Sequence, residues 1–360
     1  MENFIVSARK YRPTTWESVV GQSSITETLK GAIASNHLAQ AFLFTGPRGV
    51  GKTTTARILA KTINRNDLNG DISEDEDFAF NIFELDAASN NSVDDIRQLI
   101  DQVRIPPQIG SHKVYIIDEV HMLSASAFNA FLKTLEEPPE HAIFILATTE
   151  KHKVIPTIIS RCQVFDFQRI QINDIVKYLQ FIAKSEGINV EEDALHTIAQ
   201  KADGGMRDAL SLFDQIVSFS GNTVTYQNVI DNLNILDFEY YFKMTNYILE
   251  HNSSEALVLF NKILENGFDG HNFLNGLASH FRDLLMGGNS NTIELLEVSE
   301  NIKVRYFEQT KKCSPDFLLD ALQLLSDADY RYKASKNQRL LVEICLMQLA
   351  SVSDGGEKKN

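Results

Sequence analysis

The sequence is poor in cysteine and has no long apolar run. It contains three cysteines in 360 residues, Cys162, Cys313 and Cys345. Their odd number and wide spacing argue against a disulfide framework, so a reducing compartment, the cytoplasm, is the simplest expectation. No apolar run approaches the roughly 18–20 residues that span a bilayer, and the first residues lack the basic and apolar blocks of a signal peptide. We therefore expect a cytoplasmic protein with no membrane association.

Basic residues are also scarce relative to acidic ones. The chain has 34 Lys and Arg against 48 Asp and Glu, which gives a formal net charge of −14. Proteins that bind nucleic acid usually carry a basic patch, but here the acidic residues are unevenly distributed. Residues 63–102 hold eleven acidic side chains against two basic ones, whereas residues 1–62 hold eight basic side chains against three acidic ones. The net charge therefore leaves room for a local basic surface and does not decide whether the chain binds nucleic acid.

The first half of the chain alternates between strand-like and helix-like segments. The apolar runs that predict strands cover 41–45, 81–86, 114–118, 143–147 and 162–167. Helical patterns follow the first four of them, at 52–63, 92–104, 124–136 and 154–160. Continuously apolar strands are expected where helices cover both faces of a parallel sheet. This pattern predicts a doubly wound α/β domain.

The second half of the chain reads as helical. After about residue 170 the strand signal disappears, and helical patterns cover 172–185, 191–202, 206–219 and 225–232. Further helices are expected from Leu236 to about Val352, with breaks at Asn252-Ser253, Gly267, Gly287-Gly288 and Pro315. The polar, acidic residues 64–80 are expected to form a surface loop. We therefore expect four parts, namely an α/β domain at 1–170, a small helical lid at 171–235, an all-α collar at 236–352 and a frayed tail at 353–360.

A phosphate-binding motif lies between the first predicted strand and the helix that follows it. Residues 46–53 fit G-x-x-x-x-G-K-[ST], in which backbone N–H groups and a helix N-terminus hold phosphate oxygens. Lys52 would reach the β- and γ-phosphates, and the Thr53 hydroxyl would ligate Mg²⁺. The expected nucleotide contacts are Gly46, Pro47, Arg48, Gly49, Val50, Gly51, Lys52, Thr53 and Thr54. A chance glycine-rich turn would not be flanked by both a strand and a helix, so the motif predicts a bound nucleoside triphosphate.

Two polar segments end predicted strands and complete a candidate hydrolytic site. Asp118 and Glu119 follow an apolar run, at the edge where α/β sheets bind ligands. Asp118 would hold Mg²⁺ through water, and Glu119 would polarise the attacking water. A pair of acidic residues that caps the following helix is the alternative interpretation. Thr148 and Thr149 end the next strand and could sense the γ-phosphate, or could be ordinary turn residues.

Two arginines stand at positions that suggest a role in phosphate chemistry. Arg161 lies at the start of the last predicted strand, where an arginine is usually a solvated or structural charge. In ring-forming nucleotide hydrolases, an arginine there stabilises transition-state charge on the neighbouring subunit's γ-phosphate. Arg207 begins a predicted lid helix, where the helix dipole disfavours a cation. This placement suggests that Arg207 contacts phosphate in its own chain.

The motifs in combination resemble the bacterial DNA polymerase III gamma/tau subunit, the ATPase of the clamp loader and a member of the AAA+ class. The resemblance covers residues 9–210 and extends to the helical remainder, which is similar to the family's collar domain. It is carried by 9–13 (RKYRP), 19–22 (VVGQ), 118–123 (DEVHML), 132–139 (LKTLEEPP), 147–150 (ATTE), 160–162 (SRC) and 205–210 (GMRDAL).

The resemblance implies an activity, partners and further site residues. It implies an ATP hydrolase that uses ATP and Mg²⁺ to load a sliding clamp on primer–template DNA during replication. Its expected partners are the delta and delta-prime subunits, further copies of itself, the clamp and DNA. By resemblance, Arg161 would act in trans and Arg207 would be a second sensor. The residues expected near the adenine are Tyr11, Arg12, Pro13 and Val20.

Two further expectations concern zinc and DNA. Family members usually carry four cysteines after the phosphate-loop helix, which bind structural zinc. Residues 63–86 contain no cysteine, so we expect no zinc site. By resemblance, the helix that begins near residue 92 faces DNA, but a capped helix with a solvated face explains the same residues. The expected DNA contacts are Ser89, Asn90, Ser92 and Arg97.

Other functional classes fit parts of the pattern. One alternative is a structural clamp-loader subunit without nucleotide turnover, against which Lys52, Thr53, Asp118 and Glu119 argue. A second is another AAA+ DNA-remodelling ATPase, such as a branch-migration motor, which the helical collar and the Ser-Arg-Cys sequence disfavour. The segment DEVH at 118–121 also resembles a helicase motif, but the other helicase motifs are not evident.

Overall fold

The computed structural model describes residues 5–67, 78, 80–289, 292–296 and 298–352. The chain divides into two compact units. The first is built from residues up to 187 together with 198–215, and the second from 188–197 together with the residues from 216 onward. The domain boundaries expected from the sequence stay predictions, because the chain passes between the two units more than once in the region from 187 to 216.

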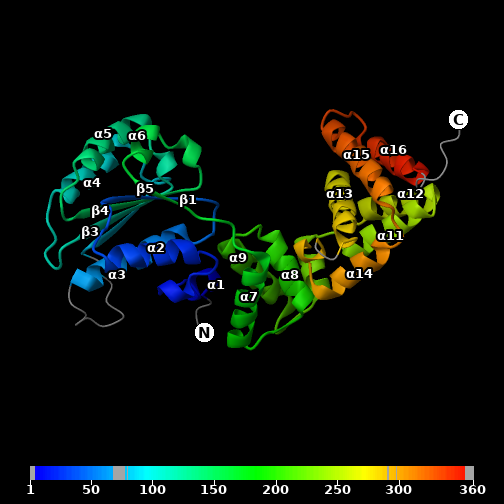
Figure 1. Ribbon diagram of the computed structural model, residues 1–360, viewed down its shortest axis with the longest axis horizontal. Helices are drawn as coiled ribbons and strands as arrows, with labels where there is room; N and C mark the ends of the chain where they lie inside the picture. The colour runs from blue at the N-terminus through cyan, green and yellow to red at the C-terminus, as the bar shows by residue number, and fades with distance from the viewer. Residues whose placement is uncertain (1–4, 68–77, 79, 290–291, 297, 353–360) are drawn as a thin grey trace. The chain divides into compact units, whose positions relative to one another are not determined.

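A five-stranded, wholly parallel sheet forms the centre of the first unit (Figure 1). The strand order is β2-β3-β4-β1-β5, so β1 lies between β4 and β5 although it is first in the chain. The strands are β1 (Ala41–Thr45), β2 (Ile82–Asp86), β3 (Lys113–Asp118), β4 (Ala142–Thr148) and β5 (Gln163–Asp166). All five predicted strands are therefore present within about a residue of their expected bounds.

Helices cover both faces of this sheet, as the apolar strands predicted. Successive side chains of a strand point to opposite faces, and β3 shows the consequence. Val114 and Ile116 join one buried cluster, whereas Tyr115 and Ile117 join another. The first cluster lies under α2 (Ser23–Ala34) and α3 (Lys52–Asp67). The second lies under α4 (Val93–Val103), α5 (Ala125–Glu136) and α6 (Pro156–Ile159) (Figure 1).

The expected loop at 64–80 is partly wrong, because α3 continues to Asp67. The extension has a physical cause in Asn64, which is fully buried. Its carboxamide donates to the Ala60 carbonyl at 3.0 Å and accepts from the Asn81 carboxamide at 2.9 Å. The polar side chain is thus satisfied within the fold and continues the helix. Most of the remaining acidic loop, 68–77 and 79, lies outside the described residues.

Helices dominate the chain after residue 170, with one exception. They are α7 (Ile172–Glu186), α8 (Glu192–Lys201), α9 (Met206–Ser220) and α10 (Tyr226–Leu233). The exception is a small parallel pair, β6 (Asn189–Val190) with β7 (Thr223–Val224). The expectation that no strand follows residue 170 is therefore wrong, because two residues are too few to produce a periodic signal. Three N-terminal elements, the short α1 (Ser7–Lys10) and η1 (Trp16–Ser18) and the longer α2, were also not predicted.

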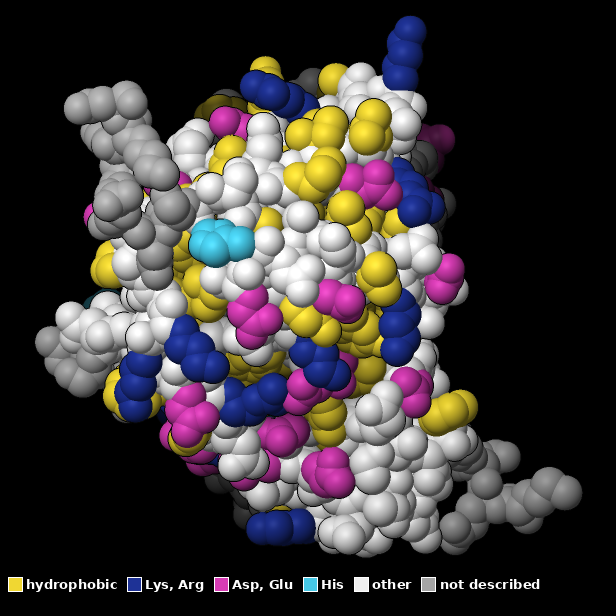
Figure 2. All heavy atoms as spheres, turned by 90° about the vertical axis from the view of Figure 1, so that its right-hand side faces the viewer, with side chains coloured by type: hydrophobic (Ala, Val, Ile, Leu, Met, Phe, Trp, Pro, Cys, Tyr) yellow, Lys and Arg dark blue, Asp and Glu magenta, His cyan; other side chains and the backbone are white. Residues whose placement is uncertain are grey.

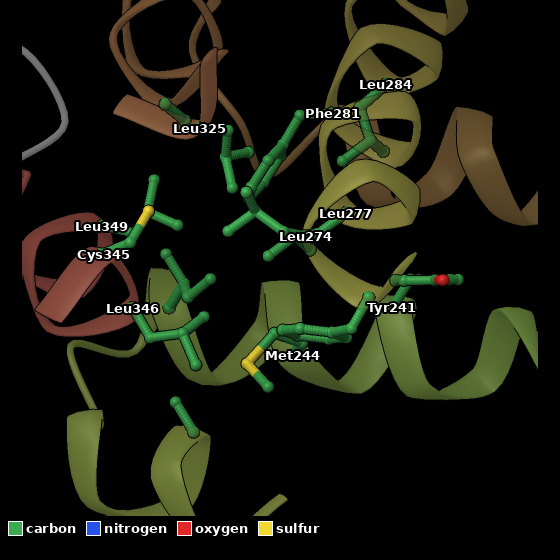
Figure 3. Packing of buried hydrophobic residues seen from close by; sticks show 14 of the residues in the cluster. Tyr241, Met244, Leu274, Leu277, Phe281, Leu284, Leu325, Cys345, Leu346 and Leu349 are labelled. Atoms are coloured by element: carbon green, nitrogen blue, oxygen red, sulfur yellow. The ribbon is translucent and has the colours of Figure 1, made fainter. Parts of the chain in front are cut away.

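The second unit contains a bundle of helices packed around one apolar core. The helices are α11 (Phe238–Leu249), α12 (Ser253–Glu265), α13 (Gly270–Gly287), α14 (Glu300–Thr310), α15 (Pro315–Tyr332) and α16 (Gln338–Ser351). Figure 3 shows Met244 of α11, Leu277 and Phe281 of α13, Leu325 of α15 and Leu346 of α16 converging on this core. The expected breaks between α11 and α12, α12 and α13, and before α15 are confirmed. The predicted tail at 353–360 lies outside the described residues.

A polar network is enclosed in this apolar core. His280 of α13 is 1% exposed, and its Nδ1 lies 3.0 Å from the hydroxyl oxygen of Tyr306. Its Nε2 lies 3.0 Å from Oε1 of Gln309. The Gln309 amide in turn donates to the Phe242 carbonyl at 2.9 Å and to Oδ1 of Asn246 at 3.0 Å. The network joins α11, α13 and α14 through groups that satisfy one another.

The surface of the second unit carries scattered large hydrophobic side chains. Val258, Leu319, Leu340, Ile344 and Met347 are exposed. Figure 2 shows one face of the molecule, on which hydrophobic side chains lie among Lys, Arg, Asp and Glu side chains. No helix of the part that the structure describes is both long and apolar enough to cross a bilayer.

Candidate functional site

The phosphate-binding motif forms the turn between β1 and α3. Gly46, Gly49 and Gly51 have φ angles of 136°, 77° and 104°, which residues with a side chain rarely adopt. At Gly46 a Cβ atom would also overlap the carbonyl oxygen of Phe167. Glycine is therefore required at this turn for two separate reasons, backbone conformation and space.

Lys52 lies at the centre of this loop. Its side chain is largely buried, and its ammonium group donates to the carbonyls of Gly46 and Pro47, both at 2.7 Å. Burial lowers the pKa of Lys52, while the nearby carboxylates of Glu119 and Asp118 oppose this shift. The loop thus concentrates a positive charge beside the backbone N–H groups at the start of α3, which is suitable for phosphate oxygens.

Asp118 and Glu119 meet the phosphate loop at the carboxyl end of β3. The Thr53 hydroxyl donates to Oδ2 of Asp118 at 2.7 Å. The other carboxylate oxygen of Asp118 accepts the backbone N–H of Glu119 at 3.0 Å. A hydroxyl and a carboxylate at this separation are oxygen ligands of the kind that Mg²⁺ takes. The expected metal-binding pair is therefore brought together, and its donor set fits the ion.

The carboxylate of Glu119 is held by the end of β4. Its Oε2 accepts the backbone N–H of Thr149 at 3.2 Å and the Thr149 hydroxyl at 3.0 Å. Glu119 itself has a left-handed backbone, with φ 48°, a conformation that costs energy in residues other than glycine. The Thr148 hydroxyl instead contacts Nδ1 of His121 at 3.0 Å and accepts the Glu150 N–H at 3.0 Å. Thr149 thus holds the candidate base directly, whereas Thr148 contacts the neighbouring His121.

A cavity of about 410 Å³ opens over the phosphate loop. It brings together residues 48–54 of the loop region, Asp118, Glu119 and the four residues expected near an adenine, Tyr11, Arg12, Pro13 and Val20. Burial is the main cause that lowers the pKa of the Arg12 guanidinium, and the neighbouring Arg57 adds to it. Sequence reasoning missed a further set of lining residues, Val6, Ala8, Arg9, Val19, Ile170, Tyr178, Met206 and Leu210. Most of these are apolar, which suits a flat ring beside a polar phosphate end.

The N-terminal segment is anchored over this cavity by contacts with α7 and α9. The backbone N–H of Ser7 donates to Asp214 at 2.7 Å. The Tyr178 hydroxyl donates to the carbonyl of Tyr11 at 2.8 Å, and Lys10 pairs with Glu186 at 2.6 Å. These partners lie far away in the sequence, so no local pattern could have revealed them.

Arg207 lines the same cavity from the start of α9. Its backbone N–H donates to the Gly49 carbonyl at 3.4 Å. A Cβ atom at Gly49 would lie 3.3 Å from the Cα of Gly205. The lid helix therefore begins directly on the backbone of the phosphate loop, as a role for Arg207 in its own chain requires.

Arg161 does not line the cavity. Its guanidinium donates to the Glu136 carboxylate at 2.5 Å and to the Thr157 carbonyl at 2.7 Å. The side chain is 33% exposed and lies between α6 and β5. This placement is compatible with action on another subunit, but it does not test that prediction.

The expected DNA contacts lie in the turn before α4, at its N-cap and in the helix, and they make local contacts. The Ser92 hydroxyl caps the helix by accepting the Asp95 N–H at 3.2 Å. Ser89 and Asn90 bond to Asp86, and Arg97 pairs with Asp94 at 3.3 Å. The role of these residues in DNA binding stays a prediction.

Three family models match successive parts of the chain. They are described as the DNA polymerase III delta subunit (residues 21–171), the ATPase lid domain of the DNA polymerase III clamp loader subunit (174–222) and the C-terminal domain of the DNA polymerase III delta subunit (239–349). The DNA polymerase III subunit gamma of Buchnera aphidicola subsp. Acyrthosiphon pisum is 38% identical over 76% of this chain and 78% of its own length. The chain belongs to the DNA polymerase III gamma/tau family.

Longer members of the gamma/tau family are also similar to the chain. The subunit tau of Bacillus subtilis is 40% identical over 96% of this chain and 63% of its own length. The subunit tau of Escherichia coli is 40% identical over 74% of this chain and 43% of its own length. The chain thus spans only part of these relatives. The family resemblance expected from the motifs is confirmed.

A solved structure of low identity supports the fold class alone. The Thermotoga maritima RuvB Holliday junction branch migration motor has a TM-score of 0.50, is 20% identical, and covers 67% of this chain and 80% of its own. The predicted architecture, a parallel α/β ATPase domain with a lid and a helical C-terminal part, is confirmed. The absence of zinc stays a prediction, although the described residues contain no group of three or more His, Cys, Asp or Glu side chains that could hold a metal.

Proposed function

We propose that this chain is the ATP-hydrolysing subunit of a bacterial clamp loader. The observation that carries the proposal is the convergence of Lys52, Thr53, Asp118 and Glu119 on one cavity in a member of the gamma/tau family. In this function, ATP binding and hydrolysis drive the loading of a sliding clamp onto primer–template DNA. The proposed partners are delta and delta-prime subunits, further copies of this chain, the clamp and DNA.

The residues of the site have separate tasks in this reaction. Lys52 turns its ammonium group from the loop carbonyls to the phosphate oxygens and offsets their charge. Thr53 and Asp118 hold Mg²⁺, which neutralises charge on the phosphates when it is bound. Glu119 orients the attacking water and accepts its proton, and Thr149 keeps its carboxylate in place. Tyr11, Arg12, Pro13 and Val20 enclose the adenosine end.

Two arginines complete the proposed reaction. Arg207 contacts phosphate from the lid of the same chain, since it already lines the cavity. Arg161 acts on the ATP of a neighbouring subunit, because it lies outside its own cavity. Its pair with Glu136 is between partly exposed groups, and such pairs contribute only about 0–1 kcal/mol. Exchange of the carboxylate for a neighbour's phosphate therefore costs little.

A structural subunit without nucleotide turnover is the second candidate. It is favoured by the description of two matching family models as delta subunit. A subunit of that kind does not need a buried lysine in a glycine loop together with a carboxylate held at the end of β4. The geometry around Lys52 and Glu119 therefore favours the hydrolysing subunit.

An ATPase assay of the assembled complex decides between the two. The chain is co-purified with delta, delta-prime and the sliding clamp, and phosphate release is measured with and without clamp and primer–template DNA. Lys52→Ala is expected to abolish ATP-dependent clamp loading. Lys61→Ala, also on α3 but outside the cavity, is the matched control and is expected to leave loading unchanged. If Lys52→Ala still loads clamps, or if the wild type does not bind ATP, the proposed function is wrong.

A further inference from the structure

His121 has a largely buried side chain for which the reaction described above has no task. It lies in η2 (Val120–Met122), two residues after Glu119 in the chain. Its side chain is 6% exposed, although three charged or polar groups surround it. Nδ1 lies 3.0 Å from the Thr148 hydroxyl and 3.3 Å from Oε2 of Glu119. Nε2 lies 3.1 Å from Oε2 of Glu150.

Within the described residues, the side-chain hydrogen bonds and the ion pair of Glu119 involve one of its two carboxylate oxygens. Oε2 faces His121 and accepts both bonds from Thr149, and none of these contacts involves Oε1. A carboxylate fixed through one oxygen presents the other in a defined direction, as a base that must meet one water molecule requires. Thr149 fixes this oxygen from β4, and His121 fixes it from the segment after β3. Two separate elements therefore determine where Oε1 points.

The imidazole ring of His121 is itself held from its far side. Glu150 faces Nε2, and Lys153 pairs with the same carboxylate at 2.8 Å. The bond from Lys153 is the main cause that lowers the pKa of Glu150, so Glu150 remains an anionic acceptor. The Glu150 backbone N–H is bonded to Thr148 at 3.0 Å. A continuous row of contacts thus runs from Lys153 through Glu150 and His121 to Glu119.

We propose that His121 is a positioning residue that directs the carboxylate of Glu119 toward the attacking water. The proposal rests on the proposed ATP hydrolysis and adds a residue to it. Nδ1–H performs the positioning by facing Oε2 of Glu119, and Nε2–H faces Glu150, which fixes the ring; both contacts together require a proton on each ring nitrogen. If His121 only filled space in the fold, kcat would not depend on which of the two ring-nitrogen positions a substitution retains.

Two amide substitutions separate the roles of the ring nitrogens. His121→Asn places an amide near the position of Nδ1, whereas His121→Gln places one near Nε2. In the assembled complex, His121→Asn is expected to keep kcat for ATP hydrolysis within a few-fold of the wild type. His121→Gln and His121→Ala are expected to lower kcat by about 10–100-fold, the scale of losing an outer partner of a reactive group. The Kd for a fluorescent ATP analogue is expected to be unchanged in all three.

Controls and a second variant keep the test independent of folding. Thermal unfolding checks each variant, and His37→Asn, an exposed histidine outside the cavity, is the matched control. Glu150→Gln alters the far side of the ring without touching Glu119, and it is expected to lower kcat several-fold at unchanged Kd. If wild-type turnover is normal but His121→Asn is no faster than His121→Gln, or if Glu150→Gln is without effect, the inference is wrong. If the wild-type complex hydrolyses no ATP, the proposed function fails and the inference with it.

Discussion

Acidification is expected to destabilise the helical C-terminal unit through His280. The buried network around this residue is closed when the ring is neutral. The Tyr306 hydroxyl can then donate to Nδ1, and the N–H at Nε2 can donate to Oε1 of Gln309. A second proton on the ring would leave Nδ1–H facing a hydroxyl that is also a donor. Burial is the main cause that lowers the pKa of His280, from 6.5 to about 3.

The sign and size of the effect follow from these two pKa values. Between them the unfolded chain binds one more proton than the folded chain, so the free energy of unfolding falls as the pH falls below 6.5. One pKa unit corresponds to about 1.4 kcal/mol, so a change from pH 7 to pH 5 is expected to remove about 2 kcal/mol. The loss continues toward pH 3, and no effect of this group is expected above pH 7.

Hydrogen exchange in increasing urea measures this free energy locally. Peptides from α13 of the wild type and of His280→Gln are followed by mass spectrometry at pH 7 and at pH 5. The variant is expected to be less stable at pH 7, because the Tyr306 hydroxyl loses its partner, but to lose about 2 kcal/mol less than the wild type on acidification. His37→Gln, an exposed histidine of the first unit, controls for the loss of an imidazole. Equal losses in the wild type and in His280→Gln would refute the argument.

Three further predictions concern the nucleotide site and the metal content. Gly51→Ala is expected to cost about 1–2 kcal/mol of unfolding free energy through backbone strain alone, and Gly46→Ala is expected to cost more, because its Cβ would overlap Phe167; equal costs in urea unfolding would contradict this. Arg161→Ala is expected to preserve ATP binding and to slow hydrolysis in the assembled complex, by at most about 10³–10⁵-fold; unchanged turnover would exclude the role in trans. Metal analysis of the purified chain is expected to find no stoichiometric zinc, and one zinc per chain would overturn the expectation from residues 63–86.

The parallel sheet could be predicted from the sequence because its strands are buried on both faces. β3 was expected at 114–118 and covers Lys113–Asp118, since a short apolar run bounded by polar residues has clear ends. Elements that bury little could not be predicted in the same way. The pair β6 and β7 has two residues in each strand, and such a length carries no period. The helix was predicted to end before Asn64 because Asn64 is polar. The sequence does not show that its side chain bonds to the buried Asn81, which lets the helix continue.

The linear motifs of the site were predictable, but the contacts between them were not. The phosphate loop is one continuous stretch of sequence, and so is the acidic pair. The spacing of residues within each motif therefore indicates its chemistry. The bond from Thr149 to Glu119 depends instead on the register of two strands. Ile117 of β3 lies opposite Leu146 of β4, which brings the residues after each strand to the same edge of the sheet. His121 was visible in the sequence as part of DEVH, but only this register shows that it faces Glu119 and Glu150.

The phosphate loop and the residue before α9 meet at two glycines, Gly49 and Gly205, which have no side chains. Gly49 and Gly205 meet backbone to backbone, and a Cβ atom on Gly205 would lie 3.2 Å from the carbonyl oxygen of Arg48. A flexible side chain between two moving parts absorbs small displacements, whereas two backbones in direct contact pass them on. A displacement of the loop would therefore reach the first turn of α9 through backbone groups, among them the Arg207 N–H and the Gly49 carbonyl that accepts it.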